Sequence, residues 1–338
     1  MAGSSHRAST DRIYHSKWNT FAEWCIAKNL DPYTATEQVV ADFLLHMFNQ
    51  GRAVSTVGTY RSAILQTLKM RGTTDLQDST VIHQLMRSFR LERPRNPRVV
   101  PRWDLNLVLS ALLKPPFEPM ATAGLKEISW KTYFLILLAA GRRRSDIHAV
   151  AANRVYSKED NSQVILYPLL GFLPKAIDAA EGGARFQPIT IPALTNSIGH
   201  GRDEPDRLLC PVRALKFYRQ RTEQLRRGRK RLFIPYKVGS TKELGINTLS
   251  SWTKLLIQLA YKTVSDQDLL LRDISAHEAR GIAASLAVQA TFSLEDIMAS
   301  CIWKNHSTFT DYYLRDVSYI LENLHTLGPI VAAGKVIG

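Results

Sequence analysis

Three short segments of this sequence hold residue types that could act on a phosphate group. The first is residues 139–147, AAGRRRSDI, where an apolar stretch ends at Gly141 and three arginines follow. A glycine at the C-terminal cap of a helix lets the chain turn sharply and presents the side chains after it. The arginines therefore form either an anion-binding cluster or a solvated basic turn.

The second segment, residues 275–281, contains His277 and Arg280, three residues apart. Residues at this spacing share one face of a helix, so both side chains can reach one phosphate. An arginine fork donates two hydrogen bonds to non-bridging oxygens, and an imidazole can donate another or exchange a proton. The same spacing also suits an ordinary surface pair.

The third segment, residues 302–315, reads IWKNHSTFTDYYLR and contains Trp303 and the adjacent Tyr312 and Tyr313. Aromatic residues at helical spacing most often pack in a core. A tyrosine hydroxyl can instead attack phosphorus when a neighbouring base accepts its proton. The segment alone leaves both interpretations open.

In this order the segments resemble the tyrosine recombinase, or phage integrase, family. Its pattern is Gly-x-Arg-x-Ser-Glu, a lysine on a β-hairpin, His-x-x-Arg, His or Trp, and Tyr; Asp146 replaces the commoner Glu here. The resemblance implies the catalytic set Arg143, Lys175, His277, Arg280, Trp303 and Tyr313. Tyr312 is the alternative nucleophile, and Lys158 is the alternative to Lys175.

Further segments are similar to the recombinases of DIRS-like and Ngaro-like retrotransposons. They are residues 172–175 (FLPK), 187–192 (QPITIP), 209–215 (LCPVRAL), 307–309 (STF) with the following YLR, and 328–333 (GPIVAA). This likeness implies a recombinase that integrates a mobile element. It would be nuclear if the element is eukaryotic and cytoplasmic otherwise.

The family chemistry implies a role for each residue of the set. Arg143 and Arg280 stabilise the extra charge of a pentavalent phosphorane, and His277 accepts the tyrosine proton. Lys175 protonates the 5′-oxygen that leaves, and the Trp303 indole N–H donates to the phosphate. The resulting 3′-phosphotyrosine needs no metal ion, nucleotide or other cofactor.

The elements that must position these residues fall into two predicted domains. Residues 1–10 are small and polar and are expected to form a disordered terminus. Residues 11–93 have apolar residues at helical spacing and predict a small all-helical domain, with Ser55 or Thr56 capping its third helix and Ser79 beginning its fourth. Residues 94–102 are rich in proline and arginine and predict a basic linker.

Residues 103–326 predict a second, mostly helical domain. Helices are expected at 105–113, 130–140, 212–225, 249–261, 277–289 and 294–302, and short strands at 164–167 and 188–191. The predicted fold class is therefore mainly α with a small antiparallel β-sheet. The resemblance names the two domains as core-binding and catalytic, and implies that residues 327–338 form a tail exchanged between protomers.

The charge of the chain favours a polyanionic partner. Lys and Arg number 44 against 30 Asp and Glu, a formal net charge of +14. We expect double-stranded DNA as the partner, and the resemblance implies a tetramer on two DNA sites, with no small-molecule substrate. The expected DNA contacts are Arg61, Arg95, Arg98, Arg102, Arg142 and Arg144.

Other features narrow the setting. Cys25, Cys210 and Cys301 have no disulfide or zinc-ligand spacing, which fits a reducing intracellular compartment. No apolar run approaches the ~20 residues of a membrane span, so no membrane partner is expected.

Three questions stay open at this point. The basic run at residues 226–231, RRGRKR, is a solvated loop, part of a nuclear import signal or a DNA contact. A DNA-binding accessory or regulator that has lost catalysis is the main alternative function. A type IB topoisomerase-like enzyme is the other.

Overall fold

The computed structural model describes residues 8–72, 76–95, 101–175, 188–194, 204–237, 239–264, 274–289, 293–302, 306, 309–310 and 313–315. Contacts within the chain divide it into two compact units, Met1–Asn96 and Pro97–Gly338. The division falls inside the predicted linker at residues 94–102, of which residues 96–100 lie outside the described part. The tail at residues 327–338 also lies outside it.

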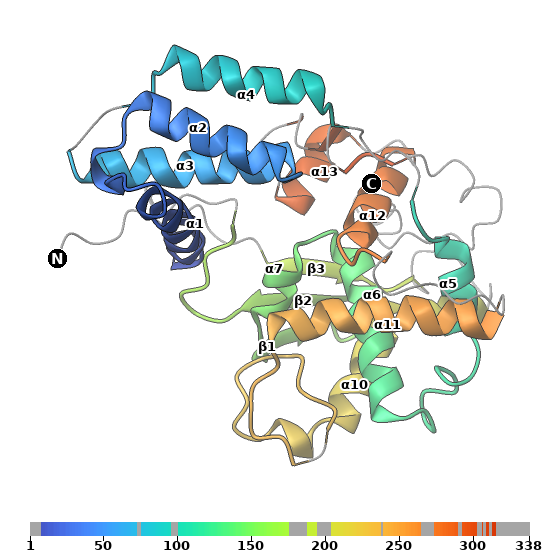
Figure 1. The fold of residues 1–338 in the computed structure, drawn as a ribbon. Coiled ribbons are helices and arrows are strands. Elements are labelled where there is room, and N and C mark those ends of the chain that lie inside the picture. Colours follow the sequence, from blue (N-terminus) through green and yellow to red (C-terminus); the bar gives the residue numbers. More distant parts are fainter. Residues whose placement is uncertain are drawn as a thin grey trace. The chain divides into compact units, whose positions relative to one another are not determined.

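The first unit is all-helical (Figure 1). It contains α1 (Ala8–Ile26), the short helix η1 (Pro32–Thr34), α2 (Glu37–Asn49), α3 (Val54–Met70) and α4 (Thr80–Glu92). Aromatic rings from different helices meet in its core, and the stacked rings of Phe48 and Phe89 join α2 to α4 with centroids 4.1 Å apart. This packing buries the apolar stripe that the helical spacing predicts.

Two helix starts in this unit differ from the prediction. Helix α1 begins at Ala8, inside the stretch expected to be disordered, with Asp11 in its first turn, where a carboxylate stabilises a helix N-terminus.

Helix α3 begins at Val54 after an N-cap, Ala53, that makes no side-chain bond. The expected cap by Ser55 or Thr56 is therefore wrong, because Val54 packs against the core and draws the first turn forward. Ser79 does cap α4, since its hydroxyl accepts the N–H of Ile82 at 3.0 Å.

The second unit holds the remaining elements. They are α5 (Leu105–Leu112), α6 (Leu125–Ala140), α7 (Arg144–His148), β1 (Val150–Ser157), β2 (Gln163–Pro168), β3 (Ile189–Pro192), α9 (Glu204–Leu209), α10 (Pro211–Arg221), η3 (Gln224–Arg226), α11 (Ile246–Val264), α12 (Glu278–Gln289) and α13 (Leu294–Cys301). Helix α6 is buried on all sides over its last three turns and contacts α10, α11, α12 and β3 (Figure 1). It is the central helix of this unit.

The three strands form one antiparallel sheet in the order β1-β2-β3. Leu166 of β2 lies opposite both Val155 of β1 and Ile189 of β3. The predicted class, mainly helical with a small antiparallel sheet, is confirmed. Strand β1 was not predicted, and its irregular pairing with β2 between Val150 and Val155 explains the missing alternation of apolar residues.

A buried ionic cluster joins α6, α10 and the loop before α6. Glu118 accepts hydrogen bonds from Lys131 at 2.6 Å and from Arg213 at 2.7 Å, and Lys131 also donates to the carbonyl of Leu112. Buried charges persist only when they are paired in this way. The cluster therefore fixes the N-terminal half of α6 against α10.

None of the described helices is both long and apolar enough to cross a membrane.

Candidate active site

The first predicted segment forms a sharp turn between α6 and α7. Gly141 ends α6 with a φ of 55°, and its N–H donates to the carbonyl of Leu137 at 3.2 Å, as the predicted glycine cap requires. Asp146 is fully buried, and its carboxylate accepts the N–H of Arg143 at 3.3 Å and the hydroxyl of Ser145 at 3.1 Å. The acidic residue of this segment thus caps α7 and holds the backbone of Arg143.

The three arginines after Gly141 have different surroundings. Arg142 is only 5% exposed, and burial lowers the pKa of its guanidinium. Arg143 is half-buried and donates to the carbonyl of Ile302 at 3.2 Å, whereas Arg144 donates to the hydroxyl of Ser250 on α11. The run is therefore built into the fold rather than being a solvated turn.

The second predicted segment lies at the start of α12. His277 is in the turn just before this helix and Arg280 in its first turn, so the expectation that both belong to the helix is wrong for His277. Arg280 is 1% exposed and donates from Nε to the carbonyl of Gly141 at 2.8 Å and from Nη2 to that of Cys301. These bonds satisfy carbonyls at the C-terminal ends of α6 and α13.

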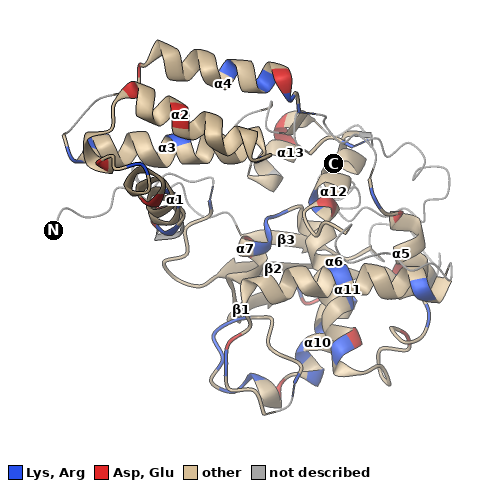
Figure 2. Ribbon diagram, viewed as in Figure 1, with Lys and Arg blue, Asp and Glu red and all other residues tan. Residues whose placement is uncertain are grey.

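A small pocket collects these side chains. It is lined by Tyr133, Leu137, Arg142, Arg143, Arg144, Ala276, His277 and Arg280. Figure 2 shows basic residues beside α7. Three consecutive arginines, Arg142, Arg143 and Arg144, belong to the lining of the pocket. Among the described residues no carboxylate lines this pocket, so its described lining suits an anion.

The electrostatics of the pocket favour the neutral form of its histidine. Partial withdrawal from water lowers the pKa of His277 first, and the positive charges of Arg144, Arg280, Arg143 and Lys175 lower it further. Burial also lowers the pKa of Arg280, to about 10. A neutral imidazole beside several fixed cations can accept a proton from a group that attacks a bound anion.

The two lysine alternatives differ in their neighbours. Lys175 is exposed after β2, and its charge is among those that lower the pKa of His277. Lys158 lies at the turn between β1 and β2, where its charge acts on Asp160. The structure therefore brings Lys175 near the pocket, and its catalytic role stays a prediction. The loop at residues 176–187 lies outside the described part.

The third segment brings Tyr313 to the same place. The guanidinium carbon of Arg280 lies 5.2 Å from the centroid of the Tyr313 ring, a cation–π arrangement. The N–H of Tyr313 donates to the carbonyl of Phe309 at 2.8 Å. Tyr312 and Trp303 lie outside the described residues. Of the other predicted catalytic residues, Arg143, His277 and Arg280 line the pocket, Tyr313 packs against Arg280, and the charge of Lys175 acts on His277.

The predicted DNA contacts fall in different settings. Arg95 and Arg102 are exposed, Arg61 is half-buried on α3, and Arg98 lies outside the described residues. Arg144 lines the pocket and is partly accessible. Arg142 is buried but lines the same pocket, so its contact with DNA stays a prediction.

The basic run at residues 226–231 is mostly structural. Arg226 donates to Leu232 and Thr222, Arg229 donates to the Lys242 carbonyl at 2.8 Å, and Arg231 donates to the His148 carbonyl at 3.1 Å. The idea of a wholly solvated loop is therefore wrong for these three arginines. The exposed cations of the run are Arg227 and Lys230.

Two residues that the sequence did not single out contact the backbone at Tyr313. They are Gly281 and Ser285, one turn apart on α12. Small residues in a buried helix usually serve close packing, so no sequence signal separates these two from others.

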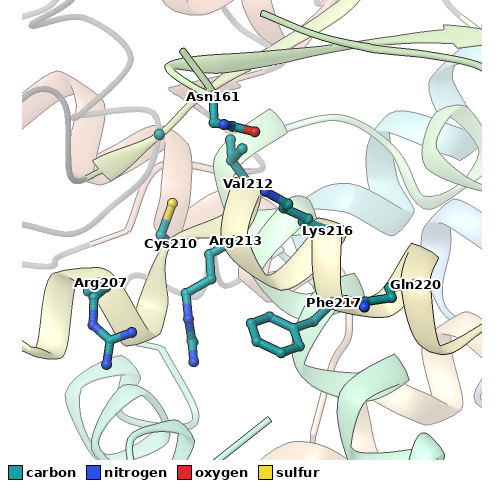
Figure 3. A pocket seen from close by; sticks show the side chains of 9 residues that line it. Asn161, Arg207, Cys210, Val212, Arg213, Lys216, Phe217 and Gln220 are labelled. Carbon is teal, nitrogen blue, oxygen red and sulfur yellow. The ribbon is translucent and has the colours of Figure 1, made fainter. Parts of the chain in front are cut away.

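A second pocket lies beside α10 and the turn between β1 and β2 (Figure 3). The side chains of Arg207 and Arg213 point the same way in it, with Lys216 and Phe217 on the following turns. Arg213 also pairs with the buried Glu118, and among the described residues no histidine, carboxylate or tyrosine lines the pocket. The described lining of this pocket therefore lacks the histidine that the first pocket has.

No protein-family model matches this sequence, and no curated protein matches it significantly. Among solved structures, the chain is similar to a lambda integrase dimer bound to a COC′ core site, with a TM-score of 0.53 and 12% identity over 93% of this chain and 91% of that one. It is also similar to a lambda integrase tetramer bound to a Holliday junction, with a TM-score of 0.52 and 13% identity over 93% and 74% of the two chains. The chain thus shares its fold with these lambda integrase structures.

Proposed function

We propose that this protein is a site-specific DNA recombinase that cleaves and rejoins double-stranded DNA through a 3′-phosphotyrosine intermediate. The observation that carries the proposal is the pocket in which Arg143, Arg280 and His277 meet beside Tyr313. The likeness in fold to two DNA-bound lambda integrase structures supports it.

In the proposed reaction the scissile phosphate occupies the arginine-lined pocket. Each guanidinium has five N–H donors, so the bond from Arg143 to Ile302 uses only part of its capacity. That bond fixes the guanidinium of Arg143 before DNA arrives, and fixed donors stabilise a developing charge without reorganisation. Arg280, tied to Gly141 and Cys301, is held in the same way.

The chemical step transfers one phosphoryl linkage. The Tyr313 oxygen bonds to phosphorus, the bond from phosphorus to the 5′-oxygen breaks, and the tyrosine proton passes to the neutral His277. Lys175 gives a proton to the departing 5′-oxygen. In the reverse step a 5′-hydroxyl of a partner strand attacks the phosphotyrosine, so religation needs no ATP.

We extend the proposal to the setting of the reaction. Because one of the similar integrases is a tetramer on a Holliday junction, we propose that this protein also acts as a tetramer on two DNA sites. The retrotransposon-like segments support a role in integrating a DIRS-like mobile element, with a nuclear location in a eukaryotic host.

The test uses nicked suicide duplexes, in which cleavage releases a short fragment that bears the free 5′-hydroxyl. Because this fragment diffuses away, religation is prevented and the covalent protein–DNA adduct accumulates. Reactions contain EDTA and no ATP, and adducts are resolved on denaturing gels. We expect adducts with wild type, none with Tyr313→Phe, and normal amounts with Tyr156→Phe, a control at an exposed tyrosine of β1. Loss with Tyr312→Phe alone would move the nucleophile by one residue.

Two other outcomes separate the remaining functions. Tight, salt-sensitive DNA binding without any adduct would replace the enzyme by a DNA-binding accessory or regulator. Adducts with relaxation of supercoiled DNA, but no exchange between two duplexes, would indicate a topoisomerase.

A further inference from the structure

The backbone that carries Tyr313 is seated on one face of α12. We call residues 313–315 the tyrosine segment. Its N-terminal side is anchored by Phe309, which is 1% exposed and whose carbonyl accepts the N–H groups of Tyr313 at 2.8 Å and Leu314 at 2.9 Å. Further contacts of the segment are made by α12, the helix that also bears Arg280.

Gly281 allows the tyrosine segment to lie close to the backbone of α12. A Cβ added at Gly281 would lie 2.8 Å from the carbonyl oxygen of Tyr313 and 3.7 Å from Cγ of Arg315. The first distance is shorter than a carbon–oxygen contact allows, and the obstructing atom belongs to the backbone, which cannot rotate away as a side chain can. Only glycine permits this approach.

Ser285, one turn further along α12, adds a directed bond. Its hydroxyl donates to the carbonyl of Gly281 at 2.8 Å, the usual bond of a serine to the preceding helical turn. The same oxygen accepts the N–H of Arg315 at 2.8 Å, and it lies 3.5 Å from the Tyr313 carbonyl. Ser285 is 1% exposed, so water does not replace this bond readily.

The side chain of Tyr313 completes the arrangement, because its ring packs against the guanidinium of Arg280 on the same helix. Helix α12 therefore contacts the tyrosine segment at three points. Arg280 packs against the Tyr313 ring, and Gly281 lies against the Tyr313 carbonyl. Ser285 accepts the N–H of Arg315. A nucleophile held by the element that also holds a phosphate-binding arginine keeps a constant distance to the phosphate.

We propose that Gly281 and Ser285 form a seat that positions the tyrosine segment relative to Arg280, which makes Ser285 a positioning residue for strand cleavage. This inference rests on the proposed function, because it assigns the seat to the nucleophile of that reaction.

The test compares Ser285→Ala with Ser129→Ala in the wild-type background of the full chain. Ser129 is a matched control, since it is a fully buried serine on α6 that donates to the carbonyl four residues before it and makes no recorded contact with the tyrosine segment. We measure the single-turnover rate of adduct formation at saturating DNA, the DNA dissociation constant and the melting temperature.

We expect Ser285→Ala to lower the cleavage rate about tenfold, the size of effect of one lost hydrogen bond, while DNA affinity changes less than about twofold. Gly281→Ala should lower the rate about 100-fold, because it displaces the backbone of the nucleophile. Its control is Gly245→Ala, whose Cβ would meet its nearest atom at an ordinary 3.6 Å. Neither control should slow cleavage.

A substrate with sulfur in place of the bridging 5′-oxygen separates positioning from leaving-group chemistry, because a thiolate leaves without protonation. The Ser285→Ala defect should persist on this substrate, whereas a Lys175→Ala defect should be relieved. Full recovery of Ser285→Ala on the sulfur substrate, or wild-type rates for Ser285→Ala on ordinary DNA, would overturn the seat but leave the recombinase intact. A wild-type protein that forms no adduct would overturn the proposed function and the seat with it.

Discussion

Four positively charged side chains act on the imidazole of His277, and they influence its protonation. His277 has the positive charges of Arg143, Arg144, Arg280 and Lys175 as neighbours. Each of them makes the imidazolium form less favourable, so the residue stays a neutral base at the pH where a tyrosine must lose its proton.

This crowding predicts how the pKa of His277 responds to a neighbouring substitution. The folded pKa lies below the ordinary 6.5, so protonation of His277 removes stability only as the pH falls below that value. Arg144→Gln should raise the pKa of His277 toward 6.5, as measured by an NMR titration of the free protein. Arg221→Gln, on the far end of α10 and outside the set of charges that act on His277, should leave it unchanged. An unchanged value in Arg144→Gln would mean that charge crowding does not control this histidine.

Replacing either of the two arginines that we propose to be catalytic, Arg143 or Arg280, by lysine tests whether the guanidinium geometry matters. Arg143→Lys and Arg280→Lys keep the charge but lose the planar fork, so cleavage should fall on the order of 10²–10³-fold. Arg280→Lys should also lower the melting temperature, since Arg280 is buried and bonded to Gly141 and Cys301. Arg227→Lys, at an exposed position of the basic run, serves as the control. Full activity of both lysine variants would argue against a phosphate site in this pocket.

At the scale of elements, helix ends position the site. Helices α6 and α13 both end in left-handed residues, Gly141 with a φ of 55° and Ile302 with a φ of 50°. The carbonyls exposed there accept bonds from Arg280 and Arg143. The arginines thus replace the hydrogen bonds that helix C-termini lack, and this fixes their directions.

Substitution of Gly141 should affect both the unfolding free energy and the cleavage rate, whereas substitution of a comparable glycine elsewhere should affect only the first. Gly141→Ala places a Cβ in the left-handed region and should cost about 1–2 kcal/mol of unfolding free energy. Gly51→Ala, which follows α2 at a φ of 78° with nothing near the added Cβ, should cost a similar amount. Only Gly141→Ala should also slow adduct formation, because its turn leads into Arg143. Calorimetry and the gel assay measure the two effects, and equal loss of activity in both variants would contradict this role.

At the scale of the whole molecule, the buried cluster of Glu118, Lys131 and Arg213 bears on the stability of the second unit. Burial opposes ionisation of Glu118, but hydrogen bonds from Arg213 and Lys131 outweigh it and lower the pKa of the carboxyl. Burial lowers the pKa of Lys131 to about 8. Two cations therefore depend on one carboxylate in the interior of the second unit.

Removing that carboxylate should destabilise the second unit strongly. Glu118→Gln leaves Lys131 and Arg213 without their counter-charge, an effect of about 3–5 kcal/mol. The control is the pair of Lys126, which is exposed, and Glu127, which is half-buried, and Glu127→Gln should cost less than about 1 kcal/mol. Urea unfolding measures both variants. A difference below about 1 kcal/mol between them would show that the cluster is dispensable.

The same cluster sets a pH dependence. Because the folded pKa of Glu118 lies below the ordinary 4.5, its stabilisation is present above that value and is lost as the pH falls through the folded pKa. Glu118→Gln should flatten this acid limb of the unfolding free energy. If the unfolding free energy of the variant falls as steeply at acid pH as that of wild type, other carboxylates cause the fall.

Much of the fold and of the site was predictable from local spacing. The apolar stripes of α2 and α11, the continuous apolar run of α6 and the glycine cap at Gly141 all depend on neighbours within a few positions. Strand β1 escaped prediction because its irregular pairing interrupts the alternation of apolar and polar residues. The start of α3 was misplaced because contact with the core, rather than a capping side chain, decides it.

The sequence by itself therefore determined which residues are available for chemistry and the helical elements that carry them. Only the tertiary structure decided that the charge of Lys175 acts on His277, that Arg142 is buried, and that the basic run binds its own backbone. The bonds involved join residues far apart in the chain, 159 positions for Arg143 and Ile302 and 139 for Arg280 and Gly141. Spacing in the sequence carries no information on such pairs, because packing of the whole unit brings them together.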